Sequence, residues 1–193
     1  MKTFAGKSAA SADKVRGGYY TPAPVARFLA RWVRQAGPKI LEPSCGDGRI
    51  LRELAALTGQ ARGVEFVALE AAKSREFAPV DAESLFTWLP RTAAASWDGV
   101  AGNPPYIRFG NWAPDQREPA LELMKGAGLR PTRLTNAWVP FVVASATLVR
   151  EGGRGHRAAR SGGWRRYRLS GSPCRRSGRR VGCCARRAGR SAA

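Results

Sequence analysis

The sequence predicts an α/β fold with a doubly wound, mainly parallel sheet. Short apolar runs alternate with amphipathic stretches between residues 24 and 149, as in strands joined by crossover helices. The 193 residues suffice for one domain with a real core, but not for a second large domain. Two Gly- or Pro-rich turns follow predicted strands directly, and such turns bind ligands in open α/β sheets.

The first predicted elements form a helix, a strand and a second helix. Pro24 suits a first helical turn, and apolar residues recur at helical spacing from Val25 to Val33. Lys39–Glu42 is the first strand, and it leads directly into the turn Pro43–Gly48. An amphipathic helix follows from Ile50 to Leu57.

The remaining elements continue the alternation of strands and helices. They are a strand at 63–69 that ends at Glu70, a helix at 71–77, a weaker strand and turn at 81–88, a strand at 97–101, and a long buried helix at 137–149. A parallel sheet follows from this order, and we expect it to be incomplete at its C-terminal side, with no fifth strand.

The net charge of +19 is concentrated near the C-terminus. Residues 1–150 carry 20 Lys and Arg against 13 Asp and Glu, whereas residues 151–193 carry 13 Arg against Glu151 alone. We therefore divide the chain into a flexible arm (1–16), a partial α/β domain (17–153) and an Arg-rich tail (154–193). The tail is interpreted either as a disordered arm that grips phosphates or, preferably, as an out-of-frame translation of GC-rich coding sequence.

Several classes of protein are disfavoured by composition. The four cysteines and the single histidine, His156, have no zinc-like spacing, so we expect no metal site. The polar N-terminus does not resemble a signal peptide, and no apolar run approaches the roughly 20 residues of a membrane span. A cytoplasmic protein is the simplest expectation.

The turn Pro43–Gly48 is the first candidate ligand site. Gly46 and Gly48 allow a tight bend and a close approach of the backbone to a ligand. Two glycines alone also occur in ordinary turns, but Glu70 lies 23 residues beyond Asp47, and an acid at about this spacing commonly binds ribose hydroxyls. Glu65 is less suited to that role, because it falls inside the predicted strand.

The second candidate site is Asn103-Pro104-Pro105-Tyr106, after the strand at 97–101. The two prolines stiffen the loop, so that it presents carbonyl oxygens outward. An asparagine oxygen and a backbone carbonyl can accept both hydrogens of an exocyclic amine, while Tyr106 can stack on a flipped-out base. An ordinary Pro-rich turn is the less favoured alternative at the carboxyl end of a strand.

The order of these motifs, with Tyr-Tyr-Thr-Pro before Glu-Pro-Ser-Cys-Gly-Asp-Gly and then Asn-Pro-Pro-Tyr, resembles the amino-DNA methyltransferases. Residues 14–153 are most similar to the adenine-N6 enzymes of restriction–modification systems. The resemblance implies a Rossmann-like class I methyltransferase sheet, S-adenosylmethionine as cofactor, and DNA with a flipped adenine as partner. The family's later strands and its separate DNA-recognition region are not found, so we expect this chain to be poorly folded and weakly active or inactive.

The resemblance also assigns individual residues. Those implied for the cofactor are Tyr20, Thr21 and Pro22 at its methionine end, Glu42, Ser44, Gly46, Asp47 and Gly48 around its amino acid portion, Glu70 at its ribose, and Asp81 or Glu83 at its adenine amine. Those implied for the target adenine are Asn103, Pro104, Pro105 and Tyr106.

Other functions remain open. Asn-Pro-Pro-Tyr also occurs in enzymes that methylate a release-factor glutamine or a ribosomal RNA guanine, although the Tyr-Tyr-Thr-Pro segment favours the DNA group. A non-catalytic remnant that binds nucleic acid through its arginines is a second alternative. A dinucleotide oxidoreductase is disfavoured, since the turn lacks GxGxxG. The sequence does not indicate an oligomeric state.

Overall fold

A parallel sheet of five strands forms the centre of the protein, of which the computed structural model describes residues 21–157. The strands are β1 (Ile40–Glu42), β2 (Ala61–Val64), β3 (Val80–Asp81), β4 (Trp97–Gly102) and β5 (Val149–Arg157). Their spatial order is β3-β2-β1-β4-β5, and every neighbouring pair is parallel. The winding direction changes between β1 and β4, and ligands bind at such a switch point in open α/β sheets.

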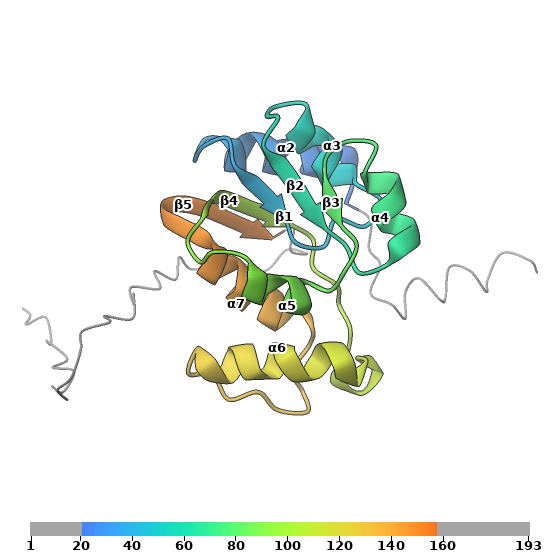
Figure 1. The fold of residues 1–193 in the computed structure, drawn as a ribbon, viewed down its shortest axis with the longest axis vertical. Helices are drawn as coiled ribbons and strands as arrows, with labels where there is room; N and C mark the ends of the chain where they lie inside the picture. The colour runs from blue at the N-terminus through green and yellow to red at the C-terminus, as the bar shows by residue number, and fades with distance from the viewer. Residues whose placement is uncertain (1–20, 158–193) are drawn as a thin grey trace, which may run out of the picture. The chain divides into compact units, whose positions relative to one another are not determined.

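Helices cover both faces of the sheet (Figure 1). One face carries α2 (Ala23–Arg34), α3 (Arg49–Ala55) and α4 (Ala68–Ser74). The other face carries α5 (Leu85–Trp88), the 3₁₀ turn η1 (Leu89–Arg91) and α7 (Trp138–Leu148). The 3₁₀ turn η2 (Phe109–Asn111) leads to α6 (Pro114–Gly126), which packs against α5 and α7 from outside. The predicted doubly wound α/β class is confirmed.

Two apolar cores lie on opposite sides of the sheet because side chains alternate along each strand. On one side, Ile40 belongs to a buried cluster with Leu54 of α3. On the other side, the neighbouring Leu41 belongs to a cluster with Val100 of β4 and Phe141 of α7. All three residues of β1 are buried, as expected for the central strand of a parallel sheet.

The second strand is shorter than the sequence predicts. It ends at Val64 instead of residue 69, because its neighbours β1 and β3 contain only three and two residues and offer no further pairing. One more ladder contact remains, from the Glu65 N–H to the Asp81 carbonyl at 3.0 Å. Glu70 consequently lies in the first turn of α4 and not at the end of a strand.

The expectation that the sheet lacks a fifth strand is wrong. β5 continues through residue 153, pairing Gly99 with Arg154 and Val100 with Gly155. The Arg154 guanidinium lies over the Trp32 ring, 5.2 Å from its centroid, and donates to the Trp32 carbonyl at 2.9 Å. Arg154, which the sequence analysis assigned to the tail, thus connects β5 to α2.

Helix α6 has no counterpart among the predicted elements. Its sequence does contain boundary features, with Pro114 in the first turn, Asp115 beside it and Lys125 in the last turn. The apolar pattern between them is weak and Pro119 interrupts it, although Ala120 and Met124 are buried. Residues 107–136 therefore read as a loop in the absence of tertiary context.

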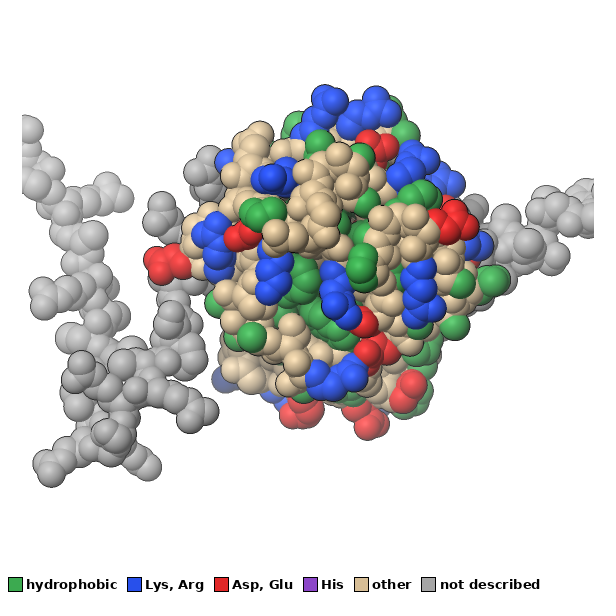
Figure 2. Space-filling view, turned by 45° about the horizontal axis from the view of Figure 1, so that its top comes forward, with side chains coloured by type: hydrophobic (Ala, Val, Ile, Leu, Met, Phe, Trp, Pro, Cys, Tyr) green, Lys and Arg blue, Asp and Glu red, His purple; other side chains and the backbone are tan. Residues whose placement is uncertain are grey.

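Charge on the visible surface is mixed. Figure 2 shows Lys and Arg side chains spread over this face, with Asp and Glu among them. No single basic patch dominates this view, which agrees with the concentration of net charge beyond residue 150.

Candidate functional site

The Gly-rich turn Pro43–Gly48 follows β1 at the carboxyl edge of the sheet. Gly46 and Gly48 have φ values of 54° and 82°, which strain residues with side chains. A Cβ atom added to Gly46 would meet nothing within 4 Å, so the bend faces open space. The Ser74 hydroxyl of α4 donates to the Gly46 carbonyl at 2.5 Å and holds the turn in place.

Glu65 is the acid that the structure brings to this turn. One of its carboxylate oxygens accepts from the Gly46 N–H at 2.8 Å, and the other accepts from the Val67 N–H at 2.9 Å. Burial raises the pKa of Glu65, and the two backbone donors oppose that rise. The residue directly after β2 therefore connects the second strand to the Gly-rich turn.

The expectation that Glu70 stands at the end of β2 is wrong, because that position belongs to Glu65. Glu70 pairs with Lys73 one turn along α4, at 2.8 Å. Its negative charge contributes to the raised pKa of Glu65, so the two acids are near neighbours. Sequence reasoning considered Glu65 but favoured Glu70, because an overlong strand prediction placed Glu65 inside the sheet.

Glu42 lies beneath the turn as a buried carboxyl group, only 2 % exposed. Its pKa is raised well above the ordinary value, first by burial and then by the charge of Glu65, while a bond from the Leu51 backbone opposes the rise. Within the described chain, its Oε2 atom is buried without a hydrogen-bond partner. A buried polar atom in this condition fits a donor supplied by a ligand.

The Asn-Pro-Pro-Tyr loop begins directly after β4, beside the Gly-rich turn. The Ser44 hydroxyl donates to the Asn103 carbonyl at 3.4 Å. A Cβ atom on Gly102 would lie 3.2 Å from the Pro43 ring, so the two backbones approach closely here. Because β1 and β4 are paired, with Ile40 opposite Gly99, their carboxyl ends bring the two motifs together. Sequence reasoning predicts this meeting correctly.

The segment before α2 lies near the same turn. Thr21 is buried, and the Pro22 carbonyl accepts from the Val25 and Ala26 N–H groups at the start of the helix. Tyr20 lies outside the described residues. The adjoining Ala23 lines a shallow pocket of about 330 Å³ together with Asp47 and Gly48.

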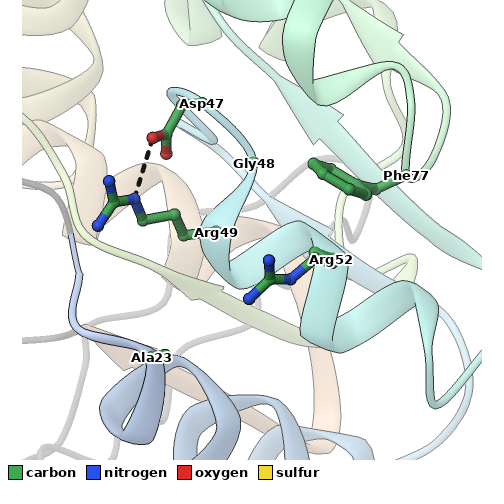
Figure 3. A pocket seen from close by; sticks show the side chains of 6 residues that line it. All are labelled: Ala23, Asp47, Gly48, Arg49, Arg52 and Phe77. Carbon is green, nitrogen blue, oxygen red and sulfur yellow. Dashed lines mark hydrogen bonds and ion pairs between the residues drawn. The ribbon is translucent and has the colours of Figure 1, made fainter.

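The far side of that pocket is formed by α3 and Phe77 (Figure 3). Arg49 and Arg52 project from α3, and Asp47 accepts from the Arg49 guanidinium at 3.0 Å. The predicted cofactor residues Ser44, Gly46, Asp47 and Gly48 thus share one turn that α2, α3 and α4 surround.

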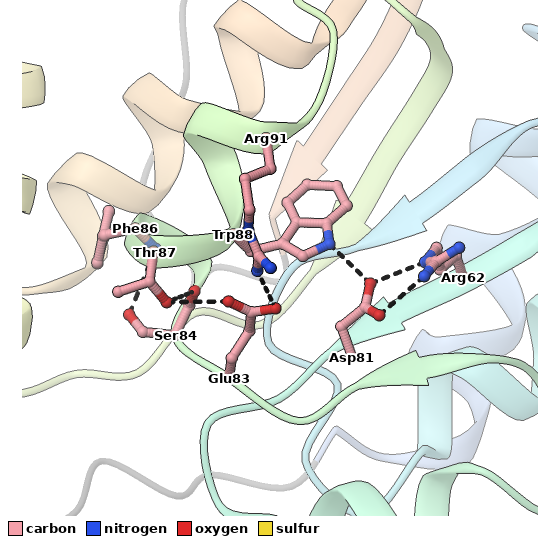
Figure 4. A network of polar contacts seen from close by, with 8 residues as sticks. All are labelled: Arg62, Asp81, Glu83, Ser84, Phe86, Thr87, Trp88 and Arg91. Atoms are coloured by element: carbon pink, nitrogen blue, oxygen red, sulfur yellow. Dashed lines mark hydrogen bonds and ion pairs between the residues drawn. The ribbon is translucent and has the colours of Figure 1, made fainter.

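Asp81 is not brought to this turn. Its carboxylate accepts two bonds from Arg62, both at 2.8 Å, and a third from the Trp88 indole at 2.6 Å (Figure 4). These bonds, led by the one from Arg62, lower the pKa of Asp81. Asp81 therefore makes a structural ion pair on the α5 side of the sheet.

Glu83 belongs to the same network as Asp81. It forms an ion pair with Arg91 and accepts from the Thr87 hydroxyl at 3.1 Å. Both acids line a pocket of about 420 Å³ that also includes Lys39 and Trp97, which lie at the amino-terminal ends of β1 and β4. The sequence-based assignment of either acid to the cofactor adenine gains no support from this position.

Phe66 is an exposed aromatic residue beside Glu65 that sequence reasoning did not single out. It follows Glu65 directly and is 53 % exposed, which is unusual for a phenylalanine between a strand and a helix. An aromatic ring next to an acid at the carboxyl edge of a sheet can cover the face of a flat ligand. The Glu-Phe pair that directly follows β2 is the sequence feature that could have indicated this residue.

The described residues have the Rossmann-like fold of class I methyltransferases. A solved structure of the type ISP restriction–modification enzyme LlaBIII bound to DNA matches 68 % of this chain and 14 % of that chain, with a TM-score of 0.50 and 15 % identity. CalS10, an amino pentose methyltransferase from Micromonospora echinaspora solved with S-adenosylmethionine bound, matches 68 % of this chain and 55 % of its own, with a TM-score of 0.40 and 18 % identity.

The chain is a homologue of a type II DNA methyltransferase. It is 31 % identical over 144 residues to the type II methyltransferase M.TthHB8I from Thermus thermophilus. The match covers 69 % of this chain, which spans 32 % of that relative's length. No protein-family model matches the chain. S-adenosylmethionine remains the cofactor that the sequence predicts for a chain similar to this methyltransferase.

Two further properties concern residues 21–157 alone. No helix in this range is long and apolar enough to cross a membrane. Across the same range, no three or more His, Cys, Asp and Glu side chains gather as a metal site.

Proposed function

We propose that this chain carries the cofactor-binding and target-binding part of a DNA methyltransferase that transfers a methyl group from S-adenosylmethionine to the N6 amine of adenine. The observation that carries the proposal is the meeting of two loops, joined by the Ser44–Asn103 hydrogen bond. S-adenosylmethionine would supply an activated methyl group where these loops meet. The pairing of β1 with β4 fixes the distance between the loops, so reactants held there share one orientation.

The cofactor side of the proposed site rests on Glu42, Gly46 and Glu65. The free oxygen of Glu42 suits a buried ammonium donor such as that of a methionine moiety. Each Glu65 oxygen has a lone pair left after its backbone bond, and these can accept ribose hydroxyls. The open space above Gly46 leaves room for the ligand, and Phe66 offers a ring to a flat base.

The target side rests on Asn103, Pro104 and Tyr106. The Asn103 side-chain oxygen and the Pro104 carbonyl would accept the two amine hydrogens, which raises electron density on the nitrogen without a strong base. The Tyr106 ring would hold an extruded adenine by stacking. Since Pro104 is buried and Pro105 fixes its own φ, the loop holds these acceptors before substrate arrives.

DNA as substrate is supported by the homologue and by the motif order that the sequence resembles. Because the chain spans 32 % of that homologue's length, sequence-specific recognition would need elements beyond those described. Within this proposal the catalytic domain begins near residue 17 and extends through β5. Residues 1–16 and the arginine-rich residues that follow β5 are the proposed arm and tail.

Replacement of Asn103 tests the proposal. Asn103→Ala should lower the rate of tritiated methyl transfer to DNA by about a hundredfold, the usual effect of losing one preorganised hydrogen-bonding group. Calorimetric binding of S-adenosylmethionine should remain near the wild-type value. The matched control Asn111→Ala removes an exposed asparagine in η2 and should leave both quantities unchanged.

The same assay decides between amine substrates. DNA, ribosomal RNA and release factor are offered to the wild-type chain in parallel, and product nucleosides are identified by mass spectrometry. N6-methyladenine in DNA supports the proposal. Methylated guanine in RNA or methylated glutamine in release factor would contradict it.

A further inference from the structure

The turn Thr132–Thr135, between α6 and α7, has no role in the function proposed above. Three hydrogen bonds close it: Thr135 N–H to the Thr132 carbonyl at 2.9 Å, Thr132 N–H to the Thr135 hydroxyl at 2.9 Å, and Leu134 N–H to the Thr132 hydroxyl at 3.2 Å. Arg133 and Leu134 lie at the tip. The turn is therefore built to hold these two side chains in a set position.

Leu134 is 93 % exposed, more than any other exposed large hydrophobic residue in the described chain. Leu129 lies in the same connection, after the end of α6, and is 43 % exposed. A leucine held in water by an ordered turn gives the fold no burial. At the tip of a closed turn, Leu134 is placed where its side chain can contact another molecule.

The surroundings of Leu134 are basic. Residues 126–137 contain Arg130 and Arg133 but no Asp or Glu. Among residues 21–157, no ion pair involves either arginine, whereas the nearby Lys125 is paired with Glu122. Two available cations beside an exposed apolar side chain complement a polyanion with an apolar interior, namely the phosphates and stacked bases of DNA.

The connection that carries the tip is bonded to the residue that follows the Asn-Pro-Pro-Tyr loop. The Ala137 N–H donates to the carbonyl of Ile107 at 2.9 Å, and Ile107 directly follows Tyr106. Leu134 is three residues before Ala137, and three residues of chain span about 10 Å at most. In Figure 1 the chain leaves α6, runs beneath it and rises to the start of α7. The tip thus lies no more than about 10 Å from Ala137, which is bonded to the residue after Tyr106.

We propose that Arg133–Leu134 is a wedge that enters the DNA base stack where the target nucleotide leaves it. Leu134 occupies the gap, and Arg133 and Arg130 contact the flanking phosphates. Insertion of an apolar side chain between bases is a known way to hold a distorted duplex. The inference rests on the proposed function, because it takes duplex DNA as the substrate of the adjoining loop.

Two duplex probes of one sequence test the wedge, one intact and one with a single abasic site. An abasic site removes the unstacking cost, so the wild-type chain should bind it about tenfold more tightly in fluorescence anisotropy. Leu134→Ser should lose this preference, and the matched Leu129→Ser should keep it. Equal preference in wild type and Leu134→Ser, or an absence of duplex binding, overturns the proposal.

Arg133→Gln separates the phosphate contact from the wedge. It should weaken binding to both probes equally and reduce the slope of log affinity against log salt by about one. Thermal melting of each variant checks that the exposed positions leave the fold intact. If Leu134→Ser instead alters sedimentation of the protein alone and leaves DNA binding unchanged, the tip contacts protein and the wedge is refuted.

Failure of the wedge is distinguishable from failure of the proposed function. Asn103→Ala should keep the abasic preference, since Leu134 is unchanged, yet lose methyl transfer. A chain that transfers methyl groups to DNA but shows no dependence on Leu134 refutes the wedge alone. A chain that binds no S-adenosylmethionine refutes the proposed function, whichever probe it prefers.

Discussion

At the residue scale, Glu65 has two functions in the proposed site. It holds the Gly-rich turn through the Gly46 N–H, and in the proposed site its carboxylate would also accept ribose hydroxyls. We predict that Glu65→Gln weakens S-adenosylmethionine binding by about tenfold, the effect of losing charge-assisted hydrogen bonds. Calorimetry measures the change, and Glu70→Gln is the matched control. A larger loss in Glu70→Gln than in Glu65→Gln would restore the ribose role to Glu70.

The buried Glu42 gives a prediction about pH. Its folded pKa lies above the ordinary 4.5, so the stabilisation it provides is fully present only below that value and is lost as pH rises through the folded pKa. Relative to Glu42→Gln, the wild-type chain should lose stability as pH rises above 4.5 toward and through the raised pKa of Glu42. Urea unfolding at a series of pH values gives the difference. A constant difference across this range would show that Glu42 does not titrate there.

Individual site residues were predictable where their positions depend only on the local sequence. The motifs at Gly46–Gly48 and at Asn103–Tyr106 require only that each follows a strand, and both do. The ribose acid depends instead on where β2 ends, and the lengths of β1 and β3 decide that. The local sequence from 63 to 69 carries no sign of its partners' lengths, so it pointed to Glu70.

At the scale of elements, the Arg62–Asp81–Trp88 contacts join β2, β3 and α5. We predict that Asp81→Ala lowers the unfolding free energy by about 1–2 kcal/mol, chiefly because the buried Trp88 indole loses its acceptor. The partly exposed Arg62 contact adds little, since solvent screens it. Urea unfolding measures the loss, and the exposed Glu122→Ala serves as control.

The same contacts have a defined pH dependence. The folded pKa of Asp81 is below the ordinary 3.8, so its contribution is present above that value and is lost as pH falls through the folded pKa. The stability gap between wild type and Asp81→Ala should therefore close in acid. If Asp81→Ala instead weakens S-adenosylmethionine binding without loss of stability, the role that the sequence suggests for Asp81 is restored.

Elements differ in how far their own sequences reveal them. The helix at 137–149 is visible because it is apolar throughout, and it appears as α7. By contrast, β5 contains Gly152 and Gly153 and has few apolar residues, so its strand character comes from pairing with β4. Helix α6 depends on contacts with α5 and α7 that no local pattern indicates.

At the scale of the molecule, much of the net positive charge lies beyond the residues that the structure describes. Residues 158–193 contain 11 Arg and no acid. We predict that a chain ending at residue 157 binds random-sequence duplex DNA more weakly and with a smaller salt dependence, because fewer counterions are released. Filter binding at several salt concentrations measures both. Unchanged binding would make the arginines incidental, and resequencing the codons for Gly152–Arg154 would test the out-of-frame interpretation directly.

The overall architecture was the most predictable level. Alternation of strands and helices gives a parallel sheet, and a parallel sheet places all carboxyl ends at one edge. That rule alone brings Ser44 next to Asn103, although 59 residues separate them in sequence. The number of strands was not predictable in this way, because the edge strand β5 is recognised only through its pairing with β4.

The bond between Ile107 and Ala137 has a consequence for how such enzymes diversify. It holds together the two ends of the segment 108–136, so this segment begins and ends at the same place in the fold. Changes in its length or sequence leave the spacing of β4 and α7 intact, provided that Trp112 and Ala120 keep their buried places. Exchange of this segment between homologues should thus change the proposed contact with the duplex and leave the proposed cofactor site unchanged.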